Sequence, residues 1–264
     1  MSWWVWGVLG CGLFDGGEPS LPPSVLPDDP MELEQGEDLS LSWRDTLAAP
    51  VERIPAETSC EDGDGDGFSN ALSCPGASPA RLDCNDADPA VTPANERWVQ
   101  PGPFLMGSDS VQSNLDEQPI HVVQLAGFCM DRYEVTQSEY AAWANRRGRI
   151  RYTPIPGAER HPATGVSWAD AMAYCTSRGK TLPPEAHWEK AARGGCELGN
   201  DASRCDPNDL RSYPWGDQPP SCALSNHRMT LGGDNNPCNT GTTAVGQMAA
   251  GVGPYGHHDL AGNV

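Results

Sequence analysis

The sequence predicts a mixed fold of short helices and short strands joined by long glycine-rich connections. Glycine and proline, with 29 and 25 residues, make up about a fifth of the 264-residue chain, whereas roughly 12% is usual. This excess argues against a helical bundle and against a regular doubly wound sheet. Capping residues followed by helical spacing mark three short helices, and short apolar runs mark the strands.

The globular part of the chain begins at Pro101, and its first elements are strands. Phe104–Gly107 predicts a short strand that ends in a turn, and His121–Leu125 predicts a second strand that leads into Phe128–Thr136. Hydrophobic residues make up only 38% of the chain, but nine tryptophans can still build a core of modest size.

Three helices follow these strands. Thr136–Glu139 is a capping box in front of apolar residues at helical spacing. Ser167–Asp170 repeats the capping pattern and predicts a helix to about Arg178, which Gly179 ends. A third helix should start at Pro183–Glu185 and run to the glycines that follow Arg193. The aromatic residues on these helices are expected to belong to the core.

Residues 1–11 contain a short apolar run that ends in Val8-Leu9-Gly10-Cys11, which resembles the lipobox of bacterial lipoprotein signals. This resemblance predicts lipidation of Cys11 and a secreted or cell-envelope protein, a bacterial lipoprotein. The alternative is an ordinary N-terminus, because the run is short and lacks the basic flank of a signal peptide. Acylation of Cys11 would leave nine cysteines, an odd number.

Residues 12–59 are polar, acidic and rich in proline, without sustained periodicity. This composition predicts a disordered linker, or tether, in which only Leu39–Leu47 could form a turn of helix. No later segment approaches the roughly 18 apolar residues that a membrane span needs.

The ten cysteines favour an oxidising compartment, because none of them forms a CxxC pair typical of metal sites. Two pairs, Cys196 with Cys205 and Cys222 with Cys238, would close short loops. Cys129 and Cys175 lie near the same predicted elements and could form a third disulfide, although the sequence alone does not fix the connectivity.

The net charge of −19 is concentrated at the N-terminal end. The first hundred residues hold 19 acidic and 4 basic residues, a net charge of −15. A chain this acidic will not bind nucleic acid by neutralising phosphates. Divalent cations are the more natural partner for this part of the chain.

Residues 60–96 form a separate unit with an acidic repeat. Asp62, Asp64 and Asp66 alternate with glycines, and Gly67 then allows a sharp turn that makes the Phe68 carbonyl a further ligand. Hard oxygen ligands at this spacing predict Ca²⁺ rather than zinc or copper. The loop is not a regular EF-hand, because Ser73 stands where that pattern has glutamate.

A second acidic cluster follows about twenty residues later and could supply the missing oxygens. The two clusters resemble the calcium repeats of thrombospondin type 3 and of bacterial surface proteins. The alternative is a solvated acidic linker held by Cys60, Cys74 and Cys84. The candidate ligands in the second cluster are Asp83, Asn85, Asp86 and Asp88.

Several blocks in the globular part resemble the formylglycine-generating enzyme family, the sulfatase-modifying factors. The resemblance covers residues 101–264 and implies an α+β fold of low regular content, related to the C-type lectin fold. The blocks, in chain order, are Phe104–Gly107, Asp131–Thr136, Gly165–Trp168, Ala173–Cys175, Gly179–Gly195, Tyr213–Asp217 and Tyr255–Val264.

The resemblance also implies an activity. Active members convert a sulfatase cysteine to formylglycine, using oxygen and a copper ion held by two cysteine thiolates. In the family this pair lies beyond the block that ends here at Val264, so we assign no catalytic residue and expect copper only if those cysteines exist. The domain is therefore expected to be incomplete at its C-terminus, either as a fragment or as a truncated, inactive product.

The resemblance also implies two structural calcium sites, and this chain contains part of the ligand set of each. One site would use the Asp259 side chain and the carbonyls of Gly262 and Val264, although Asp259 could equally be a turn or capping residue. A second site would use Asn226 and the carbonyl of His227, with Asp234 as a candidate partner. The pair His257-His258 is expected to face solvent.

Two hypotheses for the function follow. The first is a secreted or lipid-anchored oxidase of the formylglycine-generating type, whose partner is a sulfatase-like or other cell-envelope protein. The alternative is a non-catalytic, calcium-dependent binding or structural module on the cell surface. Both exclude nucleic acid, and both contact the membrane only through a lipid anchor.

Overall fold

The computed structural model describes the residues that form the folded domain and parts of the acidic unit. The predicted tether after Leu13, including Leu39–Leu47, and residues 1–9 lie outside this description. The described ranges are 10–13, 62–70, 74, 82–85, 87–110, 113–147, 152–200, 205–227, 238 and 241–264.

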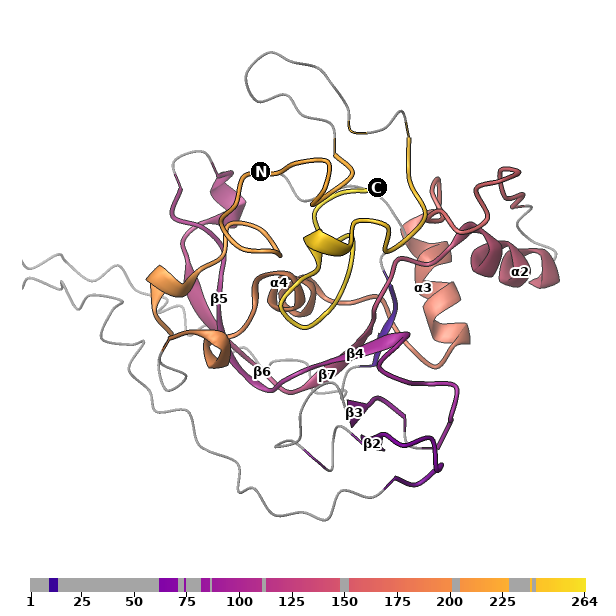
Figure 1. The fold of residues 1–264 in the computed structure, drawn as a ribbon, viewed down its shortest axis with the longest axis horizontal. Coiled ribbons are helices and arrows are strands. Elements are labelled where there is room, and N and C mark those ends of the chain that lie inside the picture. Colours follow the sequence, from indigo (N-terminus) through magenta and orange to yellow (C-terminus); the bar gives the residue numbers. More distant parts are fainter. Residues whose placement is uncertain are drawn as a thin grey trace, which may run out of the picture.

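Short strands form three small sheets (Figure 1). The largest has the order β1-β7-β4, from Gly12–Leu13, Phe128–Asp131 and Glu96–Val99, and all its pairs are antiparallel. The strands β5 (Gly102–Met106) and β6 (His121–Leu125) pair in an antiparallel ladder. The other pair, which is parallel, joins β2 (Ser69–Asn70) and β3 (Leu82–Asp83).

The two predicted strands of the globular part are confirmed. The strand β6 has the predicted bounds, and β5 ends at Met106, just before Gly107, whose φ of +90° is a turn conformation that favours glycine. A Cβ atom at Gly107 would also lie 2.7 Å from the carbonyl oxygen of Glu117. The strand β4 starts at Glu96, so the folded domain extends ahead of Pro101.

All three predicted helices are confirmed, and side chains cap the N-termini of the first two. In front of α2 (Gln137–Arg147), the Thr136 N–H donates to the Glu139 carboxylate at 2.9 Å, which closes the capping box. The helix α3 (Trp168–Ser177) starts with an N–H of Asp170 that donates to the Ser167 side chain. The helix α4 (Glu185–Arg193) starts after Pro184 and ends at Gly194, with φ +95°.

Short 3-10 turns and irregular loops make up most of the remaining described chain, which agrees with the high glycine and proline content. None of the described helices has both the length and the apolar character that a membrane crossing needs. The 3-10 turns span Leu115–Glu117, Cys196–Leu198, Pro207–Asp209 and Ala249–Gly251.

The main core lies around α4, between the strands and the C-terminal loops (Figure 1). Phe104 and Phe128 from the strands, Ala191 from α4 and Leu260 from the last loop are all buried in one cluster. A second cluster lies between α2 and α3, where Tyr140, Trp143 and Tyr174 pack with ring centroids 5.4–5.8 Å apart. These three aromatic residues are thus core residues, as predicted, whereas Trp168 at the start of α3 is 61% exposed, contrary to the prediction.

The disulfides correct one predicted pairing and confirm two. Cys196–Cys205 and Cys222–Cys238 close short loops as predicted. The predicted Cys129–Cys175 pair is wrong. Cys129 on β7 is bonded to Cys84, which precedes β4, and Cys175 on α3 is bonded to Cys11. Proximity along the predicted elements misled this assignment, because β7 and α3 each face a different segment from the N-terminal part of the chain.

The N-terminal boundary of the predicted linker is also corrected. Gly12 and Leu13 were expected in a disordered linker, but they form β1 and pair with Met130 and Cys129 of β7. Gly12 and Thr181 also exchange two backbone hydrogen bonds of 2.9 Å. This pairing on both sides, together with the disulfide at Cys11, places residues 10–13 inside the folded domain.

Candidate functional site

The acidic loop, residues 62–68, brings three carboxylates together. Ligand oxygens of Asp62, Asp64 and Asp66 all lie within 4.8 Å of one another. Three like charges at this separation repel one another, and a bound cation would remove the repulsion. The three carboxylates therefore fit a hard cation such as Ca²⁺.

Backbone N–H groups of the same loop orient these carboxylates. Gly65 and Gly67 donate to the two oxygens of Asp62 at 2.6 and 3.0 Å. Phe68 donates to Asp66 at 2.8 Å. Both glycines have positive φ angles of +80° and +92°, which lets the chain turn tightly around its own side chains. The alternation in the sequence thus produces the convergence that it predicted.

The second acidic cluster does not join this group in the described residues. Asp83 is buried in β3, in register with Asn70 of β2. Asn85 and Asp88 form a turn of their own, in which the Asp88 N–H donates to the Asn85 carbonyl at 3.0 Å. Asp86 lies outside the described residues. The idea that the second cluster completes the first cage stays a prediction.

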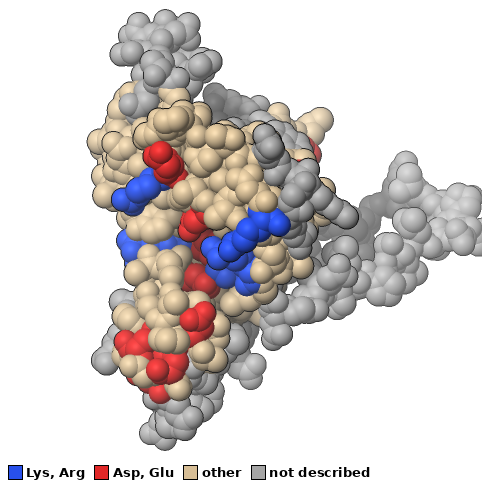
Figure 2. Space-filling view, turned by 90° about the vertical axis from the view of Figure 1, so that its right-hand side faces the viewer, with Lys and Arg blue, Asp and Glu red and all other residues tan. Residues whose placement is uncertain are grey.

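Acidic side chains gather at one end of the molecule. Figure 2 shows them as a red surface at the end that carries β2 and β3 in Figure 1. Asp62, shortly before β2 in the sequence, and Asp88, shortly after β3, are both exposed. Basic residues lie nearer the middle of the same face. This end of the molecule is therefore the part of the described surface best suited to a divalent cation.

The last sequence block places Asp259 in an internal turn. Its φ is +58°, and its Oδ2 accepts a hydrogen bond of 2.6 Å from the N–H of Gly246. Burial raises the pKa of Asp259, and this hydrogen bond opposes the rise. Gly262 has a φ of +144°, and Val264 is the final residue. The contact with Gly246 gives the carboxylate a turn-stabilising role, and calcium ligation at this block stays a prediction.

At the second calcium site that the family resemblance implies, the backbone carbonyls of both residues accept hydrogen bonds. The Asn226 carbonyl accepts from the Asn263 N–H at 2.8 Å, and the His227 carbonyl accepts from the Cys238 N–H at 3.3 Å. The candidate partner Asp234 lies outside the described residues. Ligation by Asn226 and His227 therefore also stays a prediction.

A buried polar network links the first sequence blocks of the domain to the last. The Asn263 side chain donates to Glu134 at 2.7 Å and accepts from the Thr243 N–H at 2.7 Å. Burial, and then the nearby Asp259, raise the pKa of Glu134 well above its ordinary value, while the bond from Asn263 opposes the rise. This carboxyl therefore favours its neutral form inside the domain. Sequence reasoning missed it, because a single glutamate before a capping box carries no distinct signal.

The two adjacent histidines are buried, contrary to the sequence expectation of a solvent-facing pair. His257 is fully buried, and this burial lowers its pKa to about 3. His258 is also buried, stacks on Tyr133 with ring centroids 5.0 Å apart, and lies 3.3 Å from the Arg132 guanidinium. Burial first, and then the two neighbouring arginines, lower the pKa of His258. Both rings are therefore neutral at neutral pH.

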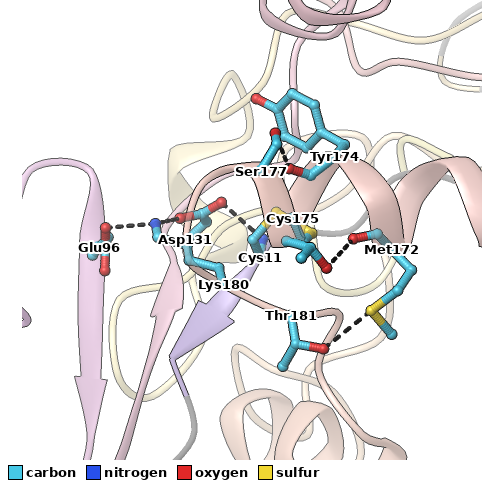
Figure 3. The surroundings of a disulfide bond; sticks show 10 residues. Cys11, Glu96, Asp131, Met172, Tyr174, Cys175, Ser177, Lys180 and Thr181 are labelled. Carbon is cyan, nitrogen blue, oxygen red and sulfur yellow. Dashed lines mark hydrogen bonds and ion pairs between the residues drawn. A yellow bond between two sulfur atoms is a disulfide. The ribbon is translucent and has the colours of Figure 1, made fainter.

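The structure places the Cys11 sulfur in a disulfide with Cys175 (Figure 3). Both residues are buried, at 1% and 0% exposure. A lipid thioether would use the same sulfur, so lipidation and this disulfide exclude one another. Lipidation of Cys11 therefore stays a prediction, for a form of the chain without this disulfide.

Next to this disulfide, one ammonium group lies between two carboxylates (Figure 3). Lys180 Nζ lies 2.5 Å from an oxygen of Glu96 and 2.5 Å from an oxygen of Asp131. Burial alone would lower the pKa of Lys180, but the two carboxylates together outweigh it and raise the pKa. Burial raises the pKa of Glu96, and the ammonium of Lys180 opposes this rise without cancelling it. Sequence patterns could not predict this cluster, since its members come from three distant segments.

The cysteines of the described residues cannot provide thiolate ligands in this state. Nine of them are described, and all nine are disulfide-bonded. A copper ion held by two thiolates needs free sulfur atoms. The described residues therefore do not fit the copper site that the resemblance implies, and no catalytic step is assigned to them.

Comparison with known proteins gives the family. A model of the sulfatase-modifying factor enzyme 1-like domain, FGE-sulfatase, matches residues 84–264. The "Formylglycine-generating enzyme" of Thermomonospora curvata is 30% identical over 218 residues, which cover 62% of this chain and 67% of that protein. The "Hercynine oxygenase" of Mycolicibacterium smegmatis is 30% identical over 203 residues, 63% of this chain and 43% of that protein.

The chain thus spans about two thirds of the first of these relatives and less than half of the second. Among solved structures, PvdO from Pseudomonas aeruginosa aligns with 64% of this chain and 67% of its own, at 23% identity and a TM-score of 0.45. That similarity is too weak to bear on the argument. The family match covers more than half of the chain and includes every block on which the resemblance rested. The chain therefore belongs to the family of sulfatase-modifying factor enzyme 1-like domains.

Proposed function

We propose that the complete protein is an oxidase of the formylglycine-generating type that acts on a substrate cysteine. The family match over residues 84–264 carries this proposal. The names of its relatives, which include a formylglycine-generating enzyme and an oxygenase, support oxidative chemistry. The family also supports a relation of the fold to C-type lectins. A sulfatase-like or other cell-envelope protein is the expected substrate.

The thiolate pair for copper is expected in sequence that follows Val264. The disulfides support this inference, because each described cysteine already has a sulfur partner. Residues 1–264 would then supply the scaffold, and the closing part of the domain would supply the metal ligands. When bound there, copper would supply the redox chemistry with oxygen.

The test compares three proteins in one assay. The longer gene product, with the sequence after Val264, is expected to convert a cysteine in a sulfatase-type peptide to an aldehyde, detected by mass spectrometry and hydrazide capture. Replacing two cysteines of the closing block by serine should abolish the conversion. Residues 1–264 alone should show none. Conversion by the shorter chain, or a closing block without cysteines, would contradict the oxidase proposal.

Calcium binding by the acidic loop is the second part of the proposal. The convergence of Asp62, Asp64 and Asp66 supports it, as do the N–H groups that fix their orientation. If the closing block holds no cysteine pair, the alternative function is a calcium-dependent binding or structural module at the cell surface. The acidic end of the molecule would then be the functional surface.

Replacing Asp64 by asparagine tests this site. The change keeps the size of the side chain but removes one of three negative charges, so Ca²⁺ affinity is expected to fall by about tenfold or more. Calorimetry measures the affinity, and limited proteolysis shows whether Ca²⁺ protects residues 60–96. The exposed Asp116 gives the matched control, Asp116→Asn, which should bind as the wild type does. Equal affinities for both variants, or no heat from the wild type at millimolar Ca²⁺, would contradict the site.

A secreted or cell-envelope location is also proposed. Support comes from four disulfides that are spread over the described chain and that would not persist in a reducing cytosol. A lipid anchor at Cys11 would give the membrane contact only in a form without the Cys11–Cys175 bond. Nucleic acid is not an expected partner, because the net charge is −19.

A further inference from the structure

Residues 10–13 lie in a slot with backbone walls on both sides. One wall is the edge of β7, where Gly12 and Leu13 pair with Met130 and Cys129. The other wall is Thr181, which exchanges two hydrogen bonds of 2.9 Å with Gly12. An extended segment thus fills the space between two hydrogen-bonding backbones. We call this space, between residues 128–131 and Thr181, the strand slot.

Asp131 holds the backbone of Cys11 at the entrance of the strand slot (Figure 3). Its Oδ2 accepts a hydrogen bond of 2.7 Å from the Cys11 N–H, and its own N–H donates to the Cys11 carbonyl at 2.7 Å. Its other oxygen accepts from Lys180. These contacts recognise backbone atoms, so they would serve any extended residue at this position.

The side chains of Cys11 and Leu13 contact two different hydrophobic clusters. Cys11 belongs to the core between α2 and α3, where its sulfur meets Cys175. Leu13 packs against a separate cluster that includes Trp98 and Leu82. The strand slot therefore accepts a cysteine at one position and an apolar side chain two residues later, as expected for an extended segment.

The position before the cysteine has room only for glycine. A Cβ atom on Gly10 would lie 2.5 Å from the Cβ of Asp131 and 2.9 Å from the carbonyl oxygen of Tyr133. Neither neighbour is the flexible end of a long side chain. The strand slot therefore selects glycine at this position by steric exclusion, and this selection does not depend on the disulfide.

An empty strand slot would leave backbone donors and acceptors on both walls unpaired, which is unfavourable for buried groups. We propose that the strand slot is a covalent binding site for an extended peptide of the pattern Gly-Cys-x-apolar, with Cys175 as its attachment point. Residues 10–13 are the occupant that the structure shows, and the site takes a competing peptide of the same pattern by disulfide exchange. This site is separate from the oxidase chemistry and from the acidic loop.

The exchange is balanced without an added oxidant. The thiolate of the incoming peptide attacks the Cys175 sulfur, a new S–S bond forms, and the Cys11–Cys175 bond breaks. Cys11 leaves as a thiolate with the bonding electron pair. The chain's own strand is tethered to the domain by the 48 residues between Leu13 and Asp62. A competing peptide therefore faces an effective concentration on the order of millimolar.

The experiment removes this competition by substitution in the 264-residue chain. Cys11→Ser frees the Cys175 sulfur, and Gly12→Pro also removes the N–H that donates to Thr181, so the double variant should release its own strand. Two peptides are then offered with their cysteine activated as the thionitrobenzoate mixed disulfide. One has the sequence of residues 8–14, and the other differs only by valine at the position of Gly10.

The thiolate of Cys175 displaces thionitrobenzoate, whose release is followed by absorbance, and peptide mapping locates the adduct. The glycine peptide is expected to react with Cys175 at least about tenfold faster than the valine peptide. A further Cys175→Ser change should abolish the adduct. Equal rates for the two peptides, or no adduct at Cys175 with either, would overturn the proposal. Reaction of both peptides with the free amino acid cysteine, measured in parallel, corrects for their intrinsic reactivity.

Discussion

Lys180 is the single positive charge between two buried carboxylates, and replacing it by methionine gives the sharpest test of this packing. Methionine keeps the length and apolar stem of the side chain, so the change removes chiefly the ammonium group. Glu96 and Asp131, with side-chain exposures of 5% and 22%, would then be left without the cation that lies 2.5 Å from each. Removing one partner of a buried ion pair costs about 3–5 kcal/mol.

For a domain of this size, a loss of that order lowers the melting temperature by about 6–20 °C. The free energy of unfolding is measured by urea titration with the disulfides intact, at several pH values. Without the ammonium, protonation of Glu96 relieves the buried negative charge. The difference between the wild type and Lys180→Met should therefore shrink as the pH falls from 7 towards about 4.5.

Glu96→Gln in the Lys180→Met background provides the control, because it removes one of the two stranded charges and should recover part of the lost stability. A deficit below about 1 kcal/mol, typical of an exposed pair, would refute the reasoning. A large loss of stability that does not change with pH would also refute the reasoning, because the loss would then come from packing and not from charge.

Two further predictions concern groups whose pKa is shifted by burial. The pKa of Glu134 is raised above 4.5, so wild-type stability should fall as the pH rises from 4.5 through the raised value, and Glu134→Gln should lose this slope; equal slopes in urea titrations would contradict the burial argument. Burial lowers the pKa of Lys190 to about 8, although its Nζ donates to the carbonyls of Gln100 and Gly102. Wild-type stability should therefore rise between pH 8 and 10.5, and a Lys190→Met variant that rises in the same way would contradict this assignment.

Local sequence signals predicted the helices and the hairpin-like strands well. The capping box at Thr136–Glu139 works within one helical turn, and the same is true of Ser167 and Asp170. The strand His121–Leu125 was found with its bounds. In each case, the residues that decide the structure lie within a few positions of one another, so the sequence pattern contains the necessary information.

Long-range pairings were not predictable in the same way. The strand β1 has two residues, which is too few for a periodic pattern, and its partner Met130 is far along the chain. The disulfides of Cys11 and Cys84 span 164 and 45 residues, whereas the two correctly predicted ones span 9 and 16. Short loops restrict the choice of partner, and long separations leave it to the tertiary fold.

The same distinction between local and long-range information applies to the candidate site. The three aspartates of residues 62–66 are neighbours in sequence, and their convergence follows from alternation and from glycines that allow the turn. The buried carboxyl of Glu134 and the ammonium of Lys180 depend on partners from distant segments. Their chemistry is set by burial, which the sequence does not show for a single charged residue.

The most direct test of the architecture is a disulfide map of the unreduced protein. Digestion without reduction, followed by mass spectrometry, should yield a cross-linked species that joins the peptide containing Cys11 to the peptide containing Cys175. That species should separate into its two parts on reduction. A Cys11 that carries a lipid, or a Cys175 that is bonded to Cys129, would contradict the placement of residues 10–13 in the strand slot.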